Sequence, residues 1–150
     1  MAITREDFPL PDTTDERTAG YFAAAARGEL AIPRCDSCAA WCWYPRPDCP
    51  ACGGTAFTWT ATSGRGRLFS WVVARRAFLP AFVEMVPFAT GLVSLEDDPA
   101  VRIVTLLPDV EPGDLVPEMQ MEAVFRPLAF PTVPGRSVTV PMFVPAAHDG

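Results

Sequence analysis

The sequence contains no lysine and no asparagine, so all 12 of its basic residues are arginine. The 18 acidic residues outnumber them, and the formal net charge is −6. Affinity for nucleic acid comes mainly from cations that displace the counterions of the phosphate backbone. An acidic chain is a poor candidate for that function, and we expect no nucleic-acid partner.

Histidine is almost absent, because the only one is His148, close to the C-terminus. This argues against Ser-His-Asp, Cys-His and histidine-metal chemistry alike. The acidic pair Asp97-Asp98 lies in a predicted turn, where carboxylates are more often solvated than catalytic. We therefore expect no catalytic residue in this chain.

Long apolar runs are also absent. No stretch approaches the roughly 20 residues that a helix needs to cross a bilayer. The N-terminal stretch is polar and acidic and lacks the apolar centre of a signal peptide. We expect a cytoplasmic location without membrane attachment. The 150 residues, 49% of them hydrophobic, suit one domain or one domain with a small module.

Turn residues divide the chain into short segments. Residues 1–12 are expected to be extended or loose. Thr13 and Glu16 form a capping-box pattern that predicts a short helix, which Gly28 ends. Short apolar or alternating runs between turns then predict strands. The predicted strands span residues 30–33, 57–60, 67–75, 88–95, 101–107, 119–126 and 138–140.

These segments predict a mainly β protein with an N-terminal helix, a four-cysteine zinc ribbon and a small five-stranded barrel of the OB type. The expected division places the N-terminal arm and helix at 1–28 and the zinc ribbon at 29–56. The barrel with a C-terminal tail is expected at 57–150.

Two Cys-x-x-Cys pairs, Cys35/Cys38 and Cys49/Cys52, are separated by ten residues. Each pair can hold a metal ion from one tight turn, and two such turns complete a tetrahedron of thiolates. In a reducing cytoplasm, metal ligation is a better interpretation than disulfides. We predict one structural zinc ion. Iron is the alternative, because rubredoxin also has a Cys-Pro-x-Cys-Gly turn and four thiolates accept either metal. Cys42, between two tryptophans, is expected to be packed in the ribbon.

The order of these motifs resembles the rubredoxin-like zinc-ribbon/OB-fold proteins that accompany acyl-CoA enzymes. The resemblance covers roughly residues 18–145 and includes the helix and both cysteine pairs. Its other motifs are Pro45-Arg46 between the pairs, Ser63-Gly64-Arg65-Gly66, Val86-Pro87-Phe88 and Pro141-Met142-Phe143.

The resemblance implies a non-catalytic accessory subunit that binds and completes a thiolase-like acyl-CoA enzyme. That enzyme would be a thiolase, aldolase or hydratase of steroid or fatty-acyl side-chain degradation, in a hetero-oligomer with acyl-CoA at a shared site. Ala39 departs from the family pattern, because a glycine often follows the second cysteine, and this weakens the first cysteine turn. The alternatives are a single-stranded nucleic-acid-binding module and a rubredoxin-type electron carrier.

Two groups of residues agree with a partner role. The connection at residues 77–87 is strongly apolar for a loop, which indicates an interface or, alternatively, a lid on the barrel's own core. Four arginines lie around one predicted strand and its turn, where they could contact CoA phosphates or simply form a solvated face. The interface candidates are Phe78, Leu79, Phe82 and Met85, and the phosphate candidates are Arg65, Arg67, Arg75 and Arg76.

Overall fold

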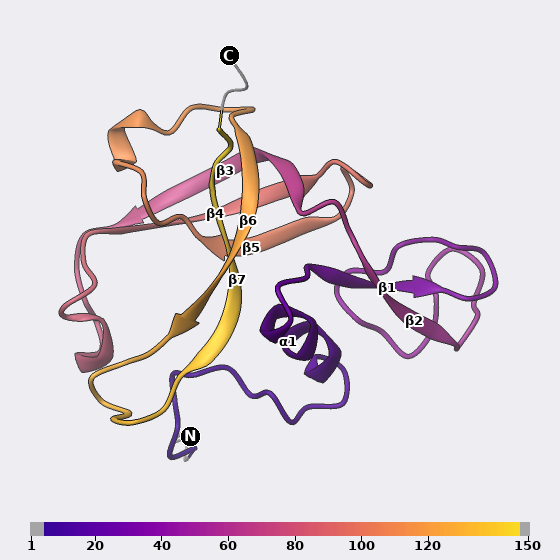
Figure 1. Ribbon diagram of the computed structural model, residues 1–150, viewed down its shortest axis with the longest axis horizontal. Helices are drawn as coiled ribbons and strands as arrows, with labels where there is room; N and C mark the ends of the chain where they lie inside the picture. The colour runs from indigo at the N-terminus through magenta and orange to yellow at the C-terminus, as the bar shows by residue number, and fades with distance from the viewer. Residues whose placement is uncertain (1–4, 148–150) are drawn as a thin grey trace.

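The computed structural model describes residues 5–147 and is mainly β (Figure 1). Within these residues, helix α1 (Ala19–Ala26) precedes the strands, and two single-turn 3-10 helices, η1 (Pro80–Phe82) and η2 (Pro112–Asp114), lie in connections between strands. The strands are β1 (Ala31–Cys35), β2 (Phe57–Ala61), β3 (Arg65–Ala74), β4 (Phe88–Leu95), β5 (Arg102–Leu106), β6 (Gln120–Leu128) and β7 (Val138–Pro145). No helix in this part of the chain is long and apolar enough to cross a membrane.

The strands form two antiparallel sheets. β1 pairs with β2 in a two-stranded ribbon, and the other five strands form one sheet in the order β5-β4-β3-β6-β7. This sheet curls until β5 and β7 contact each other, so the barrel is nearly closed. Figure 1 shows the ribbon as a lobe beside the barrel, with α1 between the two. The predicted fold class is confirmed, and β2 belongs to the sheet of the ribbon rather than to that of the barrel.

Helix α1 begins later than the capping-box pattern predicts. Its N-cap residue is Thr18, which makes no side-chain cap bond. Upstream, the backbone N–H of Arg17 donates to Oδ1 of Asp15 at 2.8 Å, so Asp15 closes a turn ahead of the helix. The capping box expected at Thr13 and Glu16 is therefore wrong. The carboxylate that accepts a backbone N–H in this segment is that of Asp15, and the helix begins only after Thr18.

The end of α1 is where the sequence predicts it. Gly28 has a φ of 78°, a left-handed conformation that glycine adopts without steric cost. Its N–H donates to the carbonyl of Ala25, and the N–H of Glu29 donates to that of Ala24. This Schellman pattern satisfies two terminal carbonyls of the helix and turns the chain into β1.

Strand β7 runs past residue 140, where the sequence predicts its end. The strand includes Pro141 and Pro145, and proline cannot donate a hydrogen bond to a ladder. β7 pairs with β6 alone and so lies at an edge of the hydrogen-bonded sheet. In an edge strand, alternate backbone N–H groups point away from the neighbouring strand and make no ladder hydrogen bond. Proline, which has no N–H, is tolerated at those positions.

The ribbon and the barrel share one hydrophobic core. Leu30 and Ile32, at the ribbon, pack in the same buried cluster as Leu68 and Phe143 of the barrel. Ile32, Leu68 and Phe143 are completely buried. A change in the ribbon must therefore reach the packing of the barrel.

A second, smaller core holds the N-terminal arm. Leu10 is 3% exposed and packs with Ala81, Phe130 and Val133. The Nη2 atom of Arg5 also donates to the carbonyl of Leu10 at 2.6 Å. The expectation of a loose arm is thus wrong for residues 5–12, and residues 1–4 lie outside the described part.

Candidate functional site

Four cysteine sulfurs meet at the far end of the ribbon. The Sγ atoms of Cys35, Cys38, Cys49 and Cys52 all lie within 4.8 Å of one another. The distances are 3.6 Å between Cys35 and Cys52 and 3.7 Å between Cys38 and Cys49. Four sulfurs at about 2.3 Å from a central zinc lie about 3.8 Å apart in a tetrahedron. The four predicted ligands are therefore positioned to bind one metal ion.

The two cysteine turns have the same backbone geometry. The N–H of Ala39 donates to the carbonyl of Cys35 at 2.9 Å, and that of Gly53 donates to the carbonyl of Cys49 at 2.8 Å. In each turn the first cysteine also donates its N–H to the carbonyl of the fifth residue after it. Ala39 has a φ of 61° and Gly53 a φ of 77°. The first cysteine turn thus has alanine at a left-handed position where the second turn has glycine.

Replacing Ala39 with glycine should raise the free energy of unfolding by about 0.5–1 kcal/mol, because an L side chain in this conformation costs more than the extra flexibility of glycine. Urea unfolding of the metal-loaded protein measures the change. The matched control is Gly53→Ala, where an added Cβ meets nothing within 4 Å, so the control reports the backbone alone. It should change stability by a similar amount in the opposite direction. If Ala39→Gly left the free energy of unfolding unchanged, the left-handed backbone of Ala39 would not be strained.

Side chains around the first cysteine turn hold it in place. The Nε of Arg34 donates to the carbonyl of Ala39 at 2.8 Å, and its guanidinium lies 4.7 Å from the ring centroid of Trp41. On the other side, the hydroxyl of Thr58 donates to Oδ1 of Asp36 at 2.7 Å. These contacts were not predicted from the sequence, although an arginine stands directly before the first cysteine.

The thiols are too close together to ionise independently. The N–H of Cys38 faces the sulfur of Cys35 and lowers the pKa of Cys35 to about 7. At Cys52, the N–H of Gly54 lowers the pKa, but the sulfurs of Cys38 and Cys35 outweigh it and raise the pKa to about 12. A divalent cation removes this repulsion between thiolates, so metal uptake releases protons.

Cys42 and Asp97, two further residues considered for chemistry, make contacts that are typical of structural roles. Cys42 is 2% exposed, burial raises the pKa of its thiol, and its Sγ lies 3.6 Å from the carbonyl oxygen of Tyr44. This agrees with a cysteine packed in the ribbon. Asp97 accepts hydrogen bonds from the N–H and the hydroxyl of Ser63, at 3.1 and 2.8 Å, and so joins the β4–β5 connection to the start of β3. His148 lies outside the described residues.

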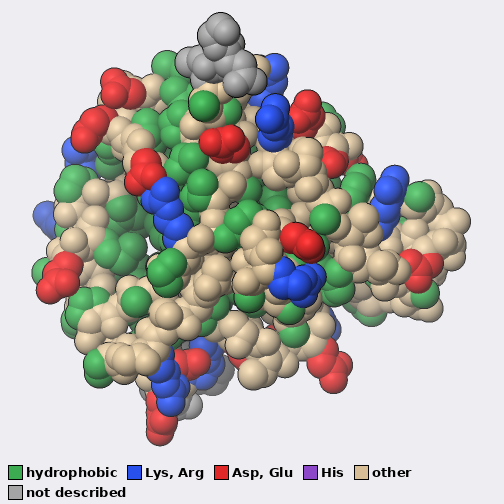
Figure 2. Space-filling model, viewed as in Figure 1, with side chains coloured by type: hydrophobic (Ala, Val, Ile, Leu, Met, Phe, Trp, Pro, Cys, Tyr) green, Lys and Arg blue, Asp and Glu red, His purple; other side chains and the backbone are tan. Residues whose placement is uncertain are grey.

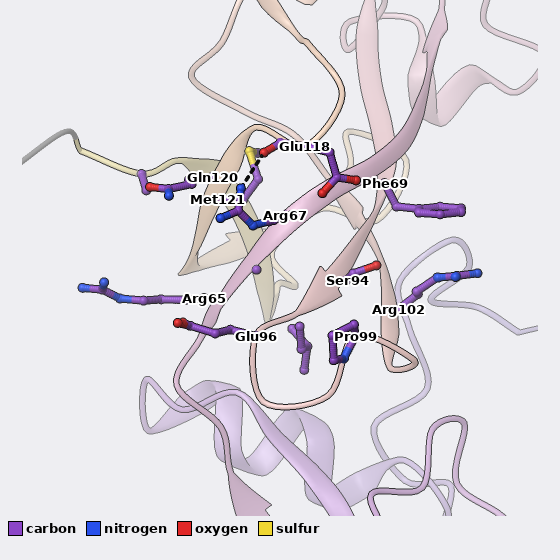
Figure 3. A pocket seen from close by; sticks show the side chains of 13 residues that line it. Arg65, Arg67, Phe69, Ser94, Glu96, Pro99, Arg102, Glu118, Gln120 and Met121 are labelled. Carbon is purple, nitrogen blue, oxygen red and sulfur yellow. Dashed lines mark hydrogen bonds between the residues drawn. The ribbon is translucent and has the colours of Figure 1, made fainter.

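The structure does not bring the four candidate arginines together. Arg65 and Arg67, at the start of β3, line a hollow of about 540 Å³ on the outer face of the barrel (Figure 3). Arg75 and Arg76, beyond the other end of β3, line a second hollow of about 500 Å³. A further arginine that the sequence analysis did not select, Arg102 of β5, lines the first hollow. Its position near Arg67 depends on how β3, β4 and β5 pair, and a local sequence pattern does not reveal that pairing.

The apolar connection at residues 77–87 divides between core and surface. Phe82 and Met85 pack against the second core, and the rings of Phe82 and Phe130 meet edge to face at 5.4 Å. Phe78 is 87% exposed and Leu79 is 42% exposed. Two of the four interface candidates are therefore surface residues, whereas the other two fold back on the chain itself.

Comparison with known families finds two domain models in tandem. The "ChsH2, rubredoxin-like zinc ribbon domain" matches residues 22–58, and the "ChsH2, C-terminal OB-fold domain" matches residues 59–126. Among solved structures, a chain of the "Ltp2-ChsH2(DUF35) aldolase" is similar over 91% of this chain and 100% of its own length. The TM-score of that pair is 0.77 and the sequence identity is 29%.

Two curated relatives are similar to this chain over parts of their length. The "Probable enoyl-CoA hydratase alpha subunit" of Thermomonospora curvata is 34% identical over 126 residues, which are 84% of this chain and 36% of that protein. A "DUF35 domain-containing scaffold protein" of Pyrococcus furiosus is 35% identical over 81 residues, 54% of this chain and 57% of that protein. The matched region thus spans only part of both relatives.

Proposed function

Because this chain belongs to the ChsH2 family of zinc-ribbon and OB-fold proteins, we propose that it is the non-catalytic accessory subunit of a thiolase-like acyl-CoA enzyme. The observation that carries this proposal is the similarity to a chain of an aldolase complex over the whole length of that chain. Relatives described as a hydratase subunit and as a scaffold protein support the same role. The partner in this proposal is an aldolase, thiolase or hydratase subunit that carries the chemistry.

The metal centre agrees with a structural role. The ribbon matches a zinc-ribbon family, and its four cysteines are positioned to bind one metal ion. Because four thiolates fill a tetrahedral zinc, no coordination position remains for water or substrate. The zinc therefore stabilises the ribbon, and the ribbon, through Leu30 and Ile32, supports the barrel.

The charge distribution supports a protein partner over a nucleic-acid strand. Figure 2 shows arginine and acidic side chains interspersed over the face in view. An OB-fold that binds single strands needs a positive groove that follows the backbone. The exposed Phe78 and Leu79 instead offer apolar area for a protein interface, and we place the partner there.

Co-expression with thiolase-, aldolase- or hydratase-like subunits encoded in the same genome tests the proposal. We expect a stable hetero-oligomer by size-exclusion chromatography with light scattering. The complex should turn over an acyl-CoA, and the isolated chain should show no thiolytic, aldol or hydratase turnover. Enzyme-like rates from the isolated chain, or failure to assemble with every such subunit, would refute the role.

A further inference from the structure

A row of polar side chains crosses the outer face of the barrel. The strand register aligns Arg67 of β3 with Gln120 of β6 on one side and with Ser94 of β4 on the other, and it aligns Ser94 with Arg102 of β5. Residues opposite one another on antiparallel strands point to the same face. The neighbour Leu68 is completely buried in the core, so the row points outward. All four residues line the hollow of about 540 Å³.

An aromatic ring orients one guanidinium of this row. The Cζ atom of Arg102 lies 3.9 Å from the ring centroid of Phe69. Stacking on a ring uses the face of a guanidinium and leaves the N–H groups at its edge free to donate. Phe69 is 46% exposed and lies at a β-bulge between Leu68 and Ser70, an irregularity that re-aims side chains.

Arg67 and Arg65 complete a set of three cations. An Nη atom of Arg67 donates to the carbonyl of Glu118 at 3.3 Å, which orients the side chain and leaves other N–H groups available (Figure 3). In the same view Arg65 lies on the opposite side of the hollow from Arg102. The ion pairs found among residues 5–147 use none of these three arginines.

The hollow is positively charged but not uniformly so. Three arginines and two glutamates, Glu96 and Glu118, line it, in a chain whose net charge is −6. Arginine binds phosphate through parallel N–H groups, whereas carboxylates and the Gln120 amide accept hydrogen bonds from hydroxyl and amino groups. The lining therefore suits a ligand that carries phosphates together with sugar or base donors, rather than a bare polyanion.

We propose that this hollow binds the phosphorylated nucleotide end of coenzyme A, a 3′-phosphorylated ADP. Arg67 and Arg102 contact phosphates, and Arg65 contacts the phosphate at the far side. The choice of coenzyme A among phosphorylated nucleotides rests on the proposed function. The volume falls within the roughly 300–1,000 Å³ usual for small-molecule sites. In this arrangement the accessory subunit holds the soluble end of the thioester, and the acyl end extends into the partner.

Isothermal titration calorimetry on the metal-loaded chain alone tests the site. Coenzyme A and adenosine 3′,5′-bisphosphate should both bind, and pantetheine should bind at least about tenfold more weakly, because it lacks the phosphates that form charge-assisted hydrogen bonds. Arg67→Gln and Arg102→Gln should each weaken binding of coenzyme A by about tenfold or more. Arg67→Lys should recover only part of the loss, because lysine keeps the charge but not the fork of donors.

The matched control is Arg76→Gln, which removes an exposed arginine from the other hollow and should change the affinity less than about twofold. Equal losses in Arg76→Gln and Arg67→Gln would overturn the site, since the effect would then be one of net charge. So would equal affinity for pantetheine, tighter binding of a thymidine oligonucleotide, or no binding at millimolar coenzyme A. Complex formation with a partner enzyme in the absence of coenzyme A binding would refute this site alone. Coenzyme A binding without assembly would refute only the proposed function.

Discussion

Cys38→Ser should abolish stoichiometric zinc binding and unfold the ribbon. A structural zinc site contributes about 10–16 kcal/mol of apparent binding free energy, which is as large as the roughly 5–15 kcal/mol that stabilises a whole domain. The parent should carry one zinc ion per chain by elemental analysis. Because Leu30 and Ile32 pack in the barrel core, the variant should also lose thermal stability in the barrel and become less soluble.

The matched control is Cys42→Ala, which removes a buried thiol from the same loop but not from the cluster of four sulfurs. It should keep its full zinc content. Full occupancy in Cys38→Ser would contradict the ligand assignment. A red parent protein that carries iron would contradict the identity of the metal while leaving the four ligands in place.

Phe78→Ser combined with Leu79→Ser should weaken the complex with the enzyme subunit by at least about tenfold, since burying apolar area contributes about 25 cal/mol per Å². The same change should alter the free energy of unfolding of the isolated chain by less than about 0.5 kcal/mol, as is usual for surface residues. Affinity is measured by calorimetry with the partner, and stability by urea unfolding. Unchanged affinity in a folded variant would place the interface elsewhere.

Phe82→Ser provides the contrasting variant from the same connection. The ring of Phe82 meets those of Phe88 and Phe130 at 6.0 and 5.4 Å, at the second core. Its removal should cost about 3 kcal/mol of stability, as for other truncated core aromatics. If Phe82→Ser remained as stable as the parent but lost the partner, this part of the connection would belong to the interface instead.

The shared core gives the accessory role a physical basis. Zinc holds two short turns that carry few apolar side chains, and β1 links those turns to the barrel. The barrel then presents two different surfaces, the exposed apolar end of the connection and the arginine hollow beside β5. One apolar surface and one arginine-lined hollow on the same barrel are what the proposed accessory role would require.

Local patterns in the sequence determined the parts of this protein that depend on neighbouring residues. The paired cysteines predicted the metal ligands, because a turn of four residues brings both sulfurs to one side. Gly28 predicted the end of the helix, because its left-handed φ is a property of one residue. Short apolar or alternating runs between turns predicted the barrel strands, and β4 begins and ends at residues 88 and 95 as expected.

Tertiary structure alone decided the features that join distant segments. Arg67 and Arg102 lie in one row across the sheet because Ser94 of β4 pairs with both of them, and register across three strands is not a local property. The connection at residues 77–87 divides between core and surface because Leu10 and Phe130 happen to meet one part of it. β7 continues through its prolines because it lies at an edge. In each case the deciding contact comes from residues far away in the chain, whose positions only the folded barrel sets.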